Sequence, residues 1–388
     1  MSAAAQVTMD PEIVHTMIEH LRENTTDLAP HDIQVPVDHF VNPARAAAEI
    51  ALFKRLPLLV AYHSDLPEPG DFITKTVLGL PLLITRQDDG SVRTYLNMCS
   101  HRGGRVETQA RGNRRVFSCR YHGWSFEANG GGLRTIPYQK SFDPIDKARH
   151  GLQSYQTEER HGLVFVDFSN DGGRRLAEYL GPQVEAQLAP WQIESSVVVL
   201  EKHFTLDVNW KLLVDGAIDV LHPQFLHPGG VGDLIETNIG VDRRYGRHAQ
   251  HFGARTKLRT LVQEGRAQEL GTRYIASNLV LYPNSMLIMA PEHLECWTVW
   301  PDADPNRASV EIRFLVRREI LTPEVERRVH KSWEILEHAA TQEDWPMEVW
   351  IQQNCRARPS GTFRYGRSEV TAQHLHRQLA RDLDGIEL

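Results

Sequence analysis

The sequence predicts a chain of two unlike modules, an all-β module at residues 58–168 and an α+β module at residues 169–388, behind a helical segment at residues 1–57. Short strand-like runs joined by tight-turn signals fill the first module, whereas helical and strand-like patterns are mixed in the second. The composition, with 41% hydrophobic and 24% charged residues over 388 positions, is that of a globular protein long enough for two domains. The predicted fold class is therefore α+β, with an all-β part.

Two helices are expected in the N-terminal segment. The first is predicted at Pro11–Glu23. The second should follow Asn42, which is a favourable capping residue, with Pro43 in the first helical position. We expect it to end at Leu56-Pro57, because a residue that precedes proline disfavours the helical conformation.

The all-β module is predicted from its hairpins. The stretch PLLITRQDDGSVRTYLN contains two strand-like runs on either side of Asp89-Gly90, a pair that favours a two-residue hairpin turn. The stretch SFEANGGGLRTIPY has the same form, with its turn at Asn129-Gly130. We therefore expect a small module of hairpins.

The α+β module begins after GLVFVDFSNDGG. A helix is predicted over NWKLLVDGAIDVLH, and strands are predicted over ASNLVLYPNSMLIMAP, LECWTVWPD and SVEIRFLVRRE. Thr322-Pro323 should cap a further helix, since apolar residues follow it at helical spacing. The stretch SEVTAQHLHRQLARDL predicts a last amphipathic helix.

Charge and composition exclude several classes of function. The formal net charge of −7 argues against a nucleic-acid partner, because phosphate binding needs a basic surface. The sequence has no apolar run of 18 residues, so no membrane span is predicted. The start, MSAAAQVTMDPE, lacks the basic and apolar regions of a signal peptide, and four cysteines in so long a chain do not suggest a disulfide framework. We expect a cytoplasmic protein, in which Cys296 and Cys355 have only structural roles.

Two Cys-His pairs lie close together in the all-β module, within CSHRGGRVETQARGNRRVFSCRYHGW. Cys99 and His101 form the first pair, and Cys119 and His122 form the second. A zinc site could use the same ligands, but the first pair is Cys-x-His rather than Cys-x-x-Cys and no zinc-finger helix follows. A Rieske [2Fe-2S] cluster needs two thiolates on one iron and two imidazoles on the other. One Cys and one His from each loop would supply that set.

The segments CSHRGG and CRYHGWSF resemble the two cluster-binding loops in the large (α) subunit of Rieske non-haem iron oxygenases, the aromatic-ring-hydroxylating type. Respiratory Rieske proteins carry two further cysteines that form a disulfide. The nearby positions here are Gly104 and Tyr121, which excludes the respiratory class. The resemblance implies an all-β Rieske domain inserted in an α+β catalytic domain, in which a curved antiparallel sheet backs a mononuclear iron site.

A second metal site is predicted in NWKLLVDGAIDVLHPQFLH. On one continuous helix Asp219 and His222 would share a face, whereas His222 and His227 would point in different directions. Pro223 should break the helix, so that irregular chain can bring His227 back to the same metal. Two histidines and one carboxylate form the facial triad of non-haem Fe(II) oxygenases, which leaves positions open for O₂.

The resemblance extends to this segment and implies the iron ligands. His222 and His227 match the two histidine ligands of the family. The family's carboxylate ligand is an Asp on a late helix, a few residues before a Gln, and Asp344 stands eight residues before Gln352. Two neighbouring acids compete with it for this role: Glu343 and Glu348.

Asp219 has a different role by resemblance. It would accept hydrogen bonds from His122 of one subunit and His222 of its neighbour, and so link cluster to iron across a trimer interface. Two positions depart from the family pattern, because Asp215 stands where most relatives have Asn and Leu221 where they have Tyr. These departures leave the substrate preference open. Three further histidines have no predicted role: His248, His251 and His293.

The resemblance implies a terminal oxygenase component that activates O₂ at Fe(II) and hydroxylates a small organic substrate by mono- or dioxygenation. An NAD(P)H-dependent reductase, with or without a ferredoxin, would supply electrons, because the sequence has no dinucleotide-binding glycine motif. The late segment GRSEVTAQHLHRQL favours an aromatic substrate. A homotrimer is implied, with or without a β subunit (α3 or α3β3). The alternatives are an oxidative N- or O-demethylase, a quaternary-amine monooxygenase, a Rieske electron-transfer protein and a zinc-binding interaction module.

Overall fold

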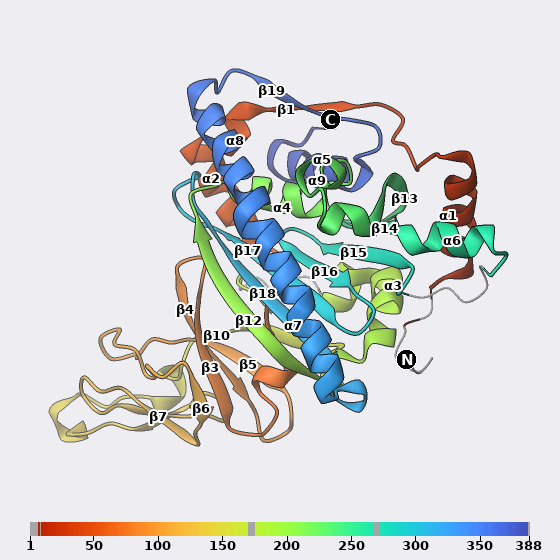
Figure 1. Ribbon diagram of the computed structural model, residues 1–388. Coiled ribbons are helices and arrows are strands. Elements are labelled where there is room, and N and C mark those ends of the chain that lie inside the picture. The colour runs from red at the N-terminus through yellow and green to blue at the C-terminus, as the bar shows by residue number, and fades with distance from the viewer. Residues whose placement is uncertain (1–6, 8, 170–174, 267–271, 387–388) are drawn as a thin grey trace. The chain divides into compact units, whose positions relative to one another are not determined.

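The computed structural model describes residues 7, 9–169, 175–266 and 272–386 (Figure 1). The chain forms two compact units. The smaller unit consists of Phe53–Tyr179 and Gln192–Ser195. The larger unit contains three segments: Met1–Leu52, Leu180–Trp191 and Ser196–Leu388. A unit built on β-sheets thus interrupts the chain of an α+β unit, which confirms the predicted fold class.

Antiparallel sheets build the smaller unit, from the strands β2 (Leu58–Tyr62), β3 (Asp71–Val77), β4 (Leu80–Arg86), β5 (Val92–Leu96), β6 (Arg111–Asn113), β7 (Val116–Ser118), β8 (Ser125–Glu127), β9 (Leu133–Thr135), β10 (Ser154–Arg160) and β11 (Leu163–Asp167). The larger sheet has the order β2-β11-β10-β5-β4-β3-β6, and the smaller has the order β7-β8-β9. Both predicted hairpins are confirmed, since β4 pairs with β5 and β8 pairs with β9.

The apolar core of the smaller unit includes the two cysteines of the Cys-His pairs. Cys99 and Cys119 belong to one cluster of buried residues with Phe72, Phe117 and Trp124. Phe72 and Phe117 pack edge to face, with ring centroids 5.3 Å apart. Because large aromatic side chains contribute most of the packing area of such a core, the cysteine ends of both loops are held by it.

One antiparallel sheet organises the larger unit, from the strands β12 (Ser196–Leu206), β13 (Ile235–Tyr245), β14 (His248–Arg255), β15 (Ile275–Leu281), β16 (Ser285–Met289), β17 (Leu294–Pro301) and β18 (Ala308–Arg317). Its order is β12-β18-β17-β16-β15-β14-β13. The strands predicted at β15 to β18 are confirmed. Directly paired residues point to the same face of a sheet, so His251 of β14, Asn278 of β15 and Ile288 of β16 share one face.

The helices are α1 (Pro11–Glu23), α2 (Pro43–Phe53), α3 (Leu176–Leu188), α4 (Trp210–Ile218), α5 (Pro223–Leu226), α6 (Thr256–Gln263), α7 (Pro323–His338), α8 (Trp345–Ala357) and α9 (Val370–Asp384). A π-helical segment, η10 (Ala339–Asp344), joins α7 to α8, so that the two form one long rod in Figure 1. Within the larger unit α4 packs on β17 and α9 packs on β13 and β14. The helices predicted at both ends of the chain and after Thr322 are confirmed.

The N-terminal segment is tied to the C-terminal part of the larger unit. Asn42 Oδ1 accepts the backbone N–H of Ala44 at 2.9 Å and caps α2, as its sequence position predicts. Strand β1 (Ile33–Pro36) pairs antiparallel with β19 (Thr362–Tyr365). The first helices are therefore part of the same unit as the late ones.

The helix predicted over NWKLLVDGAIDVLH is shorter than expected. α4 ends at Ile218, and Asp219 has extended backbone angles, with φ of −68° and ψ of 132°. The prediction that Asp219 and His222 share one helix face is therefore wrong. The carboxylate of Asp219 accepts the backbone N–H groups of Leu221 and His222, which offers this backbone an alternative to the helix. Pro223 then begins α5, a position where its missing N–H leaves no bond unmade.

Over the described part of the chain, no helix combines the length and the apolar character that crossing a membrane requires. Most of the N-terminal stretch on which the signal-peptide prediction rests, residues 1–6 and 8, lies outside the described residues.

Candidate metal centres

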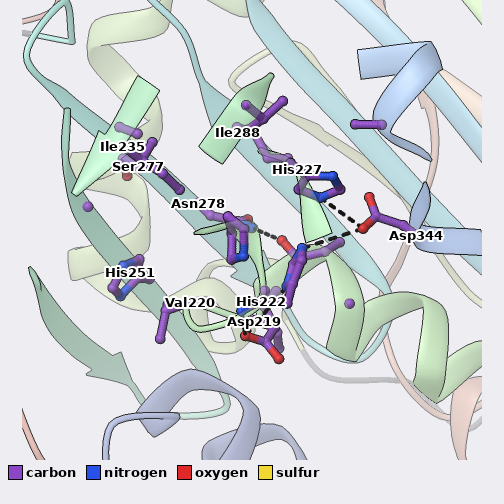
Figure 2. A pocket seen from close by; sticks show the side chains of 18 of the residues that line it. Asp219, Val220, His222, His227, Ile235, His251, Ser277, Asn278, Ile288 and Asp344 are labelled. Atoms are coloured by element: carbon purple, nitrogen blue, oxygen red, sulfur yellow. Dashed lines mark hydrogen bonds and ion pairs between the residues drawn. The ribbon is translucent and has the colours of Figure 1, made fainter. Parts of the chain in front are cut away.

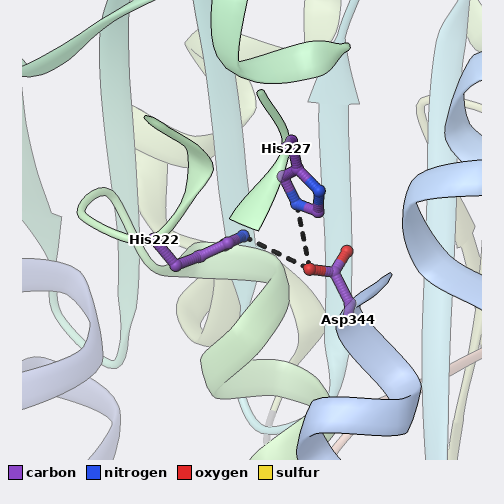
Figure 3. Close-up of side chains that lie close together, drawn as sticks. All are labelled: His222, His227 and Asp344. Atoms are coloured by element: carbon purple, nitrogen blue, oxygen red, sulfur yellow. Dashed lines mark ion pairs between the residues drawn. The ribbon is translucent and has the colours of Figure 1, made fainter. Parts of the chain in front are cut away.

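Three side chains predicted as iron ligands meet at one point of the larger unit (Figure 3). Asp344 Oδ1 lies 3.0 Å from His227 Nε2 and 3.4 Å from His222 Nε2. One potential ligand atom from each residue lies within 4.8 Å of the other two. Two imidazole nitrogens and one carboxylate oxygen are the donor set of mononuclear non-haem Fe(II) sites with open positions. The residues present therefore fit this metal.

Irregular helical segments bring the three side chains together. His222 directly precedes the one-turn helix α5 and His227 directly follows it, and their ring centroids are 5.1 Å apart. Asp344 is the last residue of η10, where the helix widens. Such π-helical turns interrupt the regular side-chain spacing of an α-helix and are frequent at functional sites. The metal group thus depends on two departures from regular helix.

Each histidine has a carboxylate at its second ring nitrogen. His227 Nδ1 lies 2.7 Å from Glu343 Oε2, and His222 Nδ1 lies 3.5 Å from Asp219 Oδ1. With a metal ion beside Asp344, each Nε2 would be the ligand nitrogen and each Nδ1 would carry the proton and donate it to its carboxylate. Glu343, a competitor for the ligand role, thus holds the ring of His227 instead.

The charges around His222 favour a cation. Burial acts to lower the pKa of His222, but hydrogen bonds with Asp219 and Asp344 outweigh it and raise the pKa to about 9. Burial acts to raise the pKa of Asp219, whereas hydrogen bonds with His222 and with the backbone of Leu221 lower it. Two carboxylates beside one ring create a negative potential that a divalent metal ion would neutralise.

A cavity of about 240 Å³ opens beside the metal group (Figure 2). His222, His227 and Asp344 all line it. An apolar cavity of about 150 Å³ is enough to hold benzene, so this one has room for one ring or two fused rings. Aliphatic side chains form much of its wall: Val220, Val231, Ile235, Ile239, Ile288 and Leu336.

Two hydrogen-bond donors stabilise the carboxylate of Asp215. Asp215 accepts hydrogen bonds from Tyr365 Oη at 2.6 Å and from His376 Nε2 at 2.9 Å.

Glu348 lines a second cavity, of about 310 Å³, with Asp215 and Asp344, and only 6% of its surface is exposed. Burial raises the pKa of Glu348 well above its usual value, and the charges of Asp344 and Asp215 add to the rise. Of the three candidate acids, Asp344 is the one whose carboxylate groups with both histidines.

In the smaller unit, the two Cys-His loops have the same backbone form. In each loop the cysteine N–H donates to the carbonyl five residues later, and a glycine N–H donates back to the cysteine carbonyl. These glycines, Gly103 and Gly123, have φ of 78° and 71°, a left-handed conformation that side chains disfavour. The shared spacing Cys-x-x-x-Gly therefore encodes the same turn in both loops.

The four predicted cluster ligands fit a Rieske cluster. The ring centroids of His101 and His122 are 4.6 Å apart, and a Cβ on Gly104 would lie 3.0 Å from Cys119 Sγ, so glycine leaves that space open. Burial raises the pKa of the Cys99 thiol and nearby Cys119 adds to the rise, against backbone hydrogen bonds that lower it. His101 Nδ1 is buried without a hydrogen-bond partner among the described residues. A buried unpartnered nitrogen is costly, and a metal bond would satisfy it.

Two contacts of the iron region have no counterpart in the sequence prediction. One is the bond from Glu343 to His227, for which the adjacency of Glu343 to Asp344 is a signal. The other joins His251, which lines the cavity, to Asp242. These two residues lie on neighbouring strands, and their pairing depends on strand register, which no local pattern reveals.

Comparison with known families agrees with this geometry. The profile of the ring hydroxylating alpha subunit (catalytic domain) matches residues 190–385, which is half of the chain. The profile of the Rieske [2Fe-2S] domain matches residues 57–156. The triad lies within the first match and both Cys-His pairs lie within the second.

Two named relatives illustrate the range of the family. The large subunit of anthranilate 1,2-dioxygenase from Burkholderia cepacia is 32% identical over 242 residues, which cover 57% of this chain and 53% of the relative. The oxygenase subunit of glycine betaine monooxygenase from Chromohalobacter salexigens is 28% identical over 214 residues, which cover 55% and 47%. The chain therefore spans about half the length of the curated relatives it matches.

Solved structures share the fold over almost the whole chain. The quaternary ammonium Rieske monooxygenase CntA, in complex with L-carnitine, has a TM-score of 0.77 at 19% identity and covers 97% of this chain and 99% of its own. Naphthalene 1,2-dioxygenase from Rhodococcus has a TM-score of 0.73 at 17% identity, with coverage of 97% and 99%. With a catalytic-domain match over half its length and a Rieske domain beside it, the chain belongs to the ring hydroxylating alpha subunits of the Rieske non-haem iron oxygenases.

Proposed function

We propose that this chain is a terminal oxygenase component. It takes electrons from an NAD(P)H-dependent reductase, with or without a ferredoxin, and uses O₂ to hydroxylate a small aromatic substrate. The observation that carries this proposal is the group His222, His227 and Asp344 at the edge of an apolar cavity. A metal site with open positions then stands where a small apolar molecule would bind.

In this proposal the residues of the larger unit have three tasks. His222, His227 and Asp344 hold the Fe(II), which supplies O₂ activation when it is bound. Glu343 and Asp219 accept from the Nδ1 atoms of the two histidines and fix both rings. The apolar wall excludes water and holds the substrate ring close to the metal.

Electrons would enter through the smaller unit. The Rieske cluster supplies one-electron transfer, and we assign four ligands to it: Cys99, His101, Cys119 and His122. We assign Asp219 as the link between the centres. Its side chain is 31% exposed while it contacts His222, so it can also accept from His122 of a neighbouring subunit. This assignment requires an oligomer, which we propose is a homotrimer, with or without a β subunit.

The cavity wall favours an aromatic substrate over a quaternary amine. Quaternary ammonium groups are typically bound by cages of several aromatic rings. Among the described residues of this wall, Trp297 is the one that carries a benzenoid ring. The aliphatic lining suits a planar ring better than a cation.

A single-turnover experiment tests the proposal. Protein with both centres loaded is reduced without O₂ and then mixed with O₂ and a panel of one-ring and two-ring aromatic compounds. We expect the cluster to reoxidise and a hydroxylated product to form. Iron analysis separates the main alternative, because an oxygenase binds one mononuclear iron beside the two cluster irons and a carrier binds the cluster irons alone. Cluster irons alone, with no product, would contradict the proposal.

A further inference from the structure

His251 lines the cavity wall and has no role in the function proposed above. It lies on β14, and Figure 2 shows it on the side of the cavity away from Asp344. Its cross-strand neighbour Asn278 also lines the cavity, but the amide nitrogen of Asn278 is already bonded to the carbonyl of Ala217 at 3.0 Å. The imidazole and Asn278 Oδ1, which is buried without a partner among the described residues, are therefore polar groups left to meet a ligand on this part of the wall.

Two glycines make room for the His251 ring. A Cβ on Gly240 would lie 2.2 Å from His251 Cε1, and a Cβ on Gly253 would lie 3.4 Å from His251 Nε2. Neither glycine has a positive φ, so backbone conformation does not require them. Because these glycines have no side chain, they leave the space that the His251 ring occupies.

A buried carboxylate fixes which nitrogen of His251 carries the proton. Asp242 Oδ1 lies 3.3 Å from His251 Nδ1 and accepts the hydroxyl of Thr371 at 2.8 Å. The Asp242 side chain is only 4% exposed. Because a carboxylate accepts, Nδ1 donates to it, and Nε2 of the neutral ring becomes a hydrogen-bond acceptor.

No described residue bonds Nε2 of His251, and this atom is not among the fully buried atoms that lack a partner. Because His251 lines the cavity, Nε2 is the ring nitrogen left for a ligand there. Apart from the metal group, the charged side chains on the described wall are acidic: Asp219 and Glu236. Glu236 is paired with Arg259 at 2.8 Å. An acceptor on this wall suits an uncharged donor, and away from the metal group a carboxylate ligand would find no lysine or arginine among the lining residues.

We propose that His251, oriented by Asp242, selects substrates that carry a hydrogen-bond donor: an amino, hydroxyl or ring N–H group on an otherwise apolar one- or two-ring body. The inference rests on the proposed function and names its substrate class. The donor binds Nε2 while the apolar body fills the cavity toward the metal group. Asp242 is a positioning residue, since it acts through the ring of His251.

Ligand pairs of matched shape test this selectivity. The pairs are aniline and toluene, indole and indene, and 2-naphthol and 2-methylnaphthalene, in which only the first member carries a donor. Dissociation constants are measured by calorimetry on the full chain with both metal centres loaded and no reductant. We expect the donor member to bind about tenfold tighter, because leaving a buried acceptor without a partner weakens binding by about that factor.

Variants assign the selectivity to His251. His251→Leu should bind both members of each pair alike, and His251→Gln, which keeps an acceptor, should recover part of the preference. Asp242→Ala should reduce the preference without abolishing metal binding. The matched control is His203→Leu, because His203 also contacts a carboxylate, that of Glu201 at 3.0 Å, but is 55% exposed on β12. It should keep the wild-type preference.

Two results would overturn the inference: wild-type protein that shows no donor preference, or His251→Leu that keeps the full preference. Failure of wild-type protein to bind any donor member would also overturn the proposed substrate class. The measurement needs no turnover, so its outcome is separate from the single-turnover test. Donor selectivity without product would count against the oxygenase proposal and leave the role of His251 in place.

Discussion

The two candidate metal centres are built in different ways. All four proposed cluster ligands come from one stretch, Cys99–His122, and each loop repeats one glycine turn over a shared apolar core. The proposed iron ligands come from two distant segments, at His222–His227 and at Asp344, and they meet only where helices are broken or widened. The first centre is therefore set by local backbone, and the second by tertiary packing and by carboxylates that hold its rings.

This difference predicts that the two centres can be removed independently. The largest effect is expected for Asp344→Ala, which removes the one carboxylate of the triad. Mononuclear iron should fall below about a tenth of its wild-type content, because loss of a supporting residue alone typically costs about 10–100-fold in metal affinity. Product formation should stop while the cluster remains reducible. Iron analysis and the visible spectrum of the cluster measure both.

The matched control for Asp344→Ala is Cys99→Ala in the other centre. It should abolish the Rieske spectrum and leave mononuclear iron bound. The choice of carboxylate is tested by Glu348→Gln, which should keep the iron, since Glu348 makes no contact with either histidine that the structure records. Full iron content in Asp344→Ala, with loss of iron in Glu343→Ala or Glu348→Ala, would show that another acid is the ligand.

The same contrast explains how much the sequence could predict. Short-range signals predicted the hairpin turns, the helix caps and the four residues that converge in the cluster loops, since each depends on a few adjacent residues. They failed at Asp219, whose side chain accepts backbone N–H groups of the residues that follow it, so that α4 ends early. Propensity favours helix there, and only the local hydrogen bonds reverse it.

Residues that act through partners on other elements were the hardest to predict. The partners of Asp215 lie on β19 and α9, at Tyr365 and His376, and the partner of His251 depends on the register of β13 with β14. Sequence spacing carries no information about such pairs. Asp344 was predictable as one of three acids, but its selection over Glu343 follows from which acid faces both histidines.

Asp219→Asn tests whether the iron centre also depends on a carboxylate outside the triad. Both metals should stay bound, because Asp219 is not a ligand in the proposed arrangement. Asn has no charge, and the NH₂ end of its side chain cannot accept from a ring N–H, so one of the two histidines loses an acceptor. Electron transfer from cluster to iron should slow by about 10–100-fold or more. Stopped-flow mixing of reduced protein with substrate and O₂ measures it.

The expected trace for Asp219→Asn is a cluster that reduces normally and reoxidises slowly, with little product. Glu343→Gln is a useful comparison, because Glu343 supports His227 rather than His222. It should weaken iron binding with a smaller effect on the transfer step. Reoxidation at the wild-type rate in an iron-replete Asp219→Asn oligomer would show that Asp219 only ends the helix.

The smallest expected effect concerns Glu348, a carboxyl group of the iron region. Glu348 is buried, and no described residue bonds its Oε2. Burial, with Asp344 and Asp215, raises the pKa of Glu348 well above its usual value. A raised pKa in the folded state gives stability that is present below the unfolded pKa, about 4.3, and is lost as pH rises toward the folded pKa.

Glu348→Gln should therefore flatten the pH dependence of the free energy of unfolding. As the pH rises above the unfolded pKa of a glutamate, about 4.3, the variant should gain on wild-type protein in free energy of unfolding, with a slope of at most about 1.4 kcal/mol per pH unit, because unfolding of the wild type then releases the proton that its buried carboxyl group holds. Denaturant unfolding of the metal-loaded protein at several pH values measures this. The slope is the readout, because the amide also changes packing near Gly216, whose Cβ position lies 2.0 Å from Glu348 Oε1. Glu326→Gln, an exposed change on α7, is the control. Parallel pH profiles for Glu348→Gln and wild type would mean that Glu348 is ionised in the folded protein, and that the iron region tolerates a buried carboxylate beside Asp344 and Asp215.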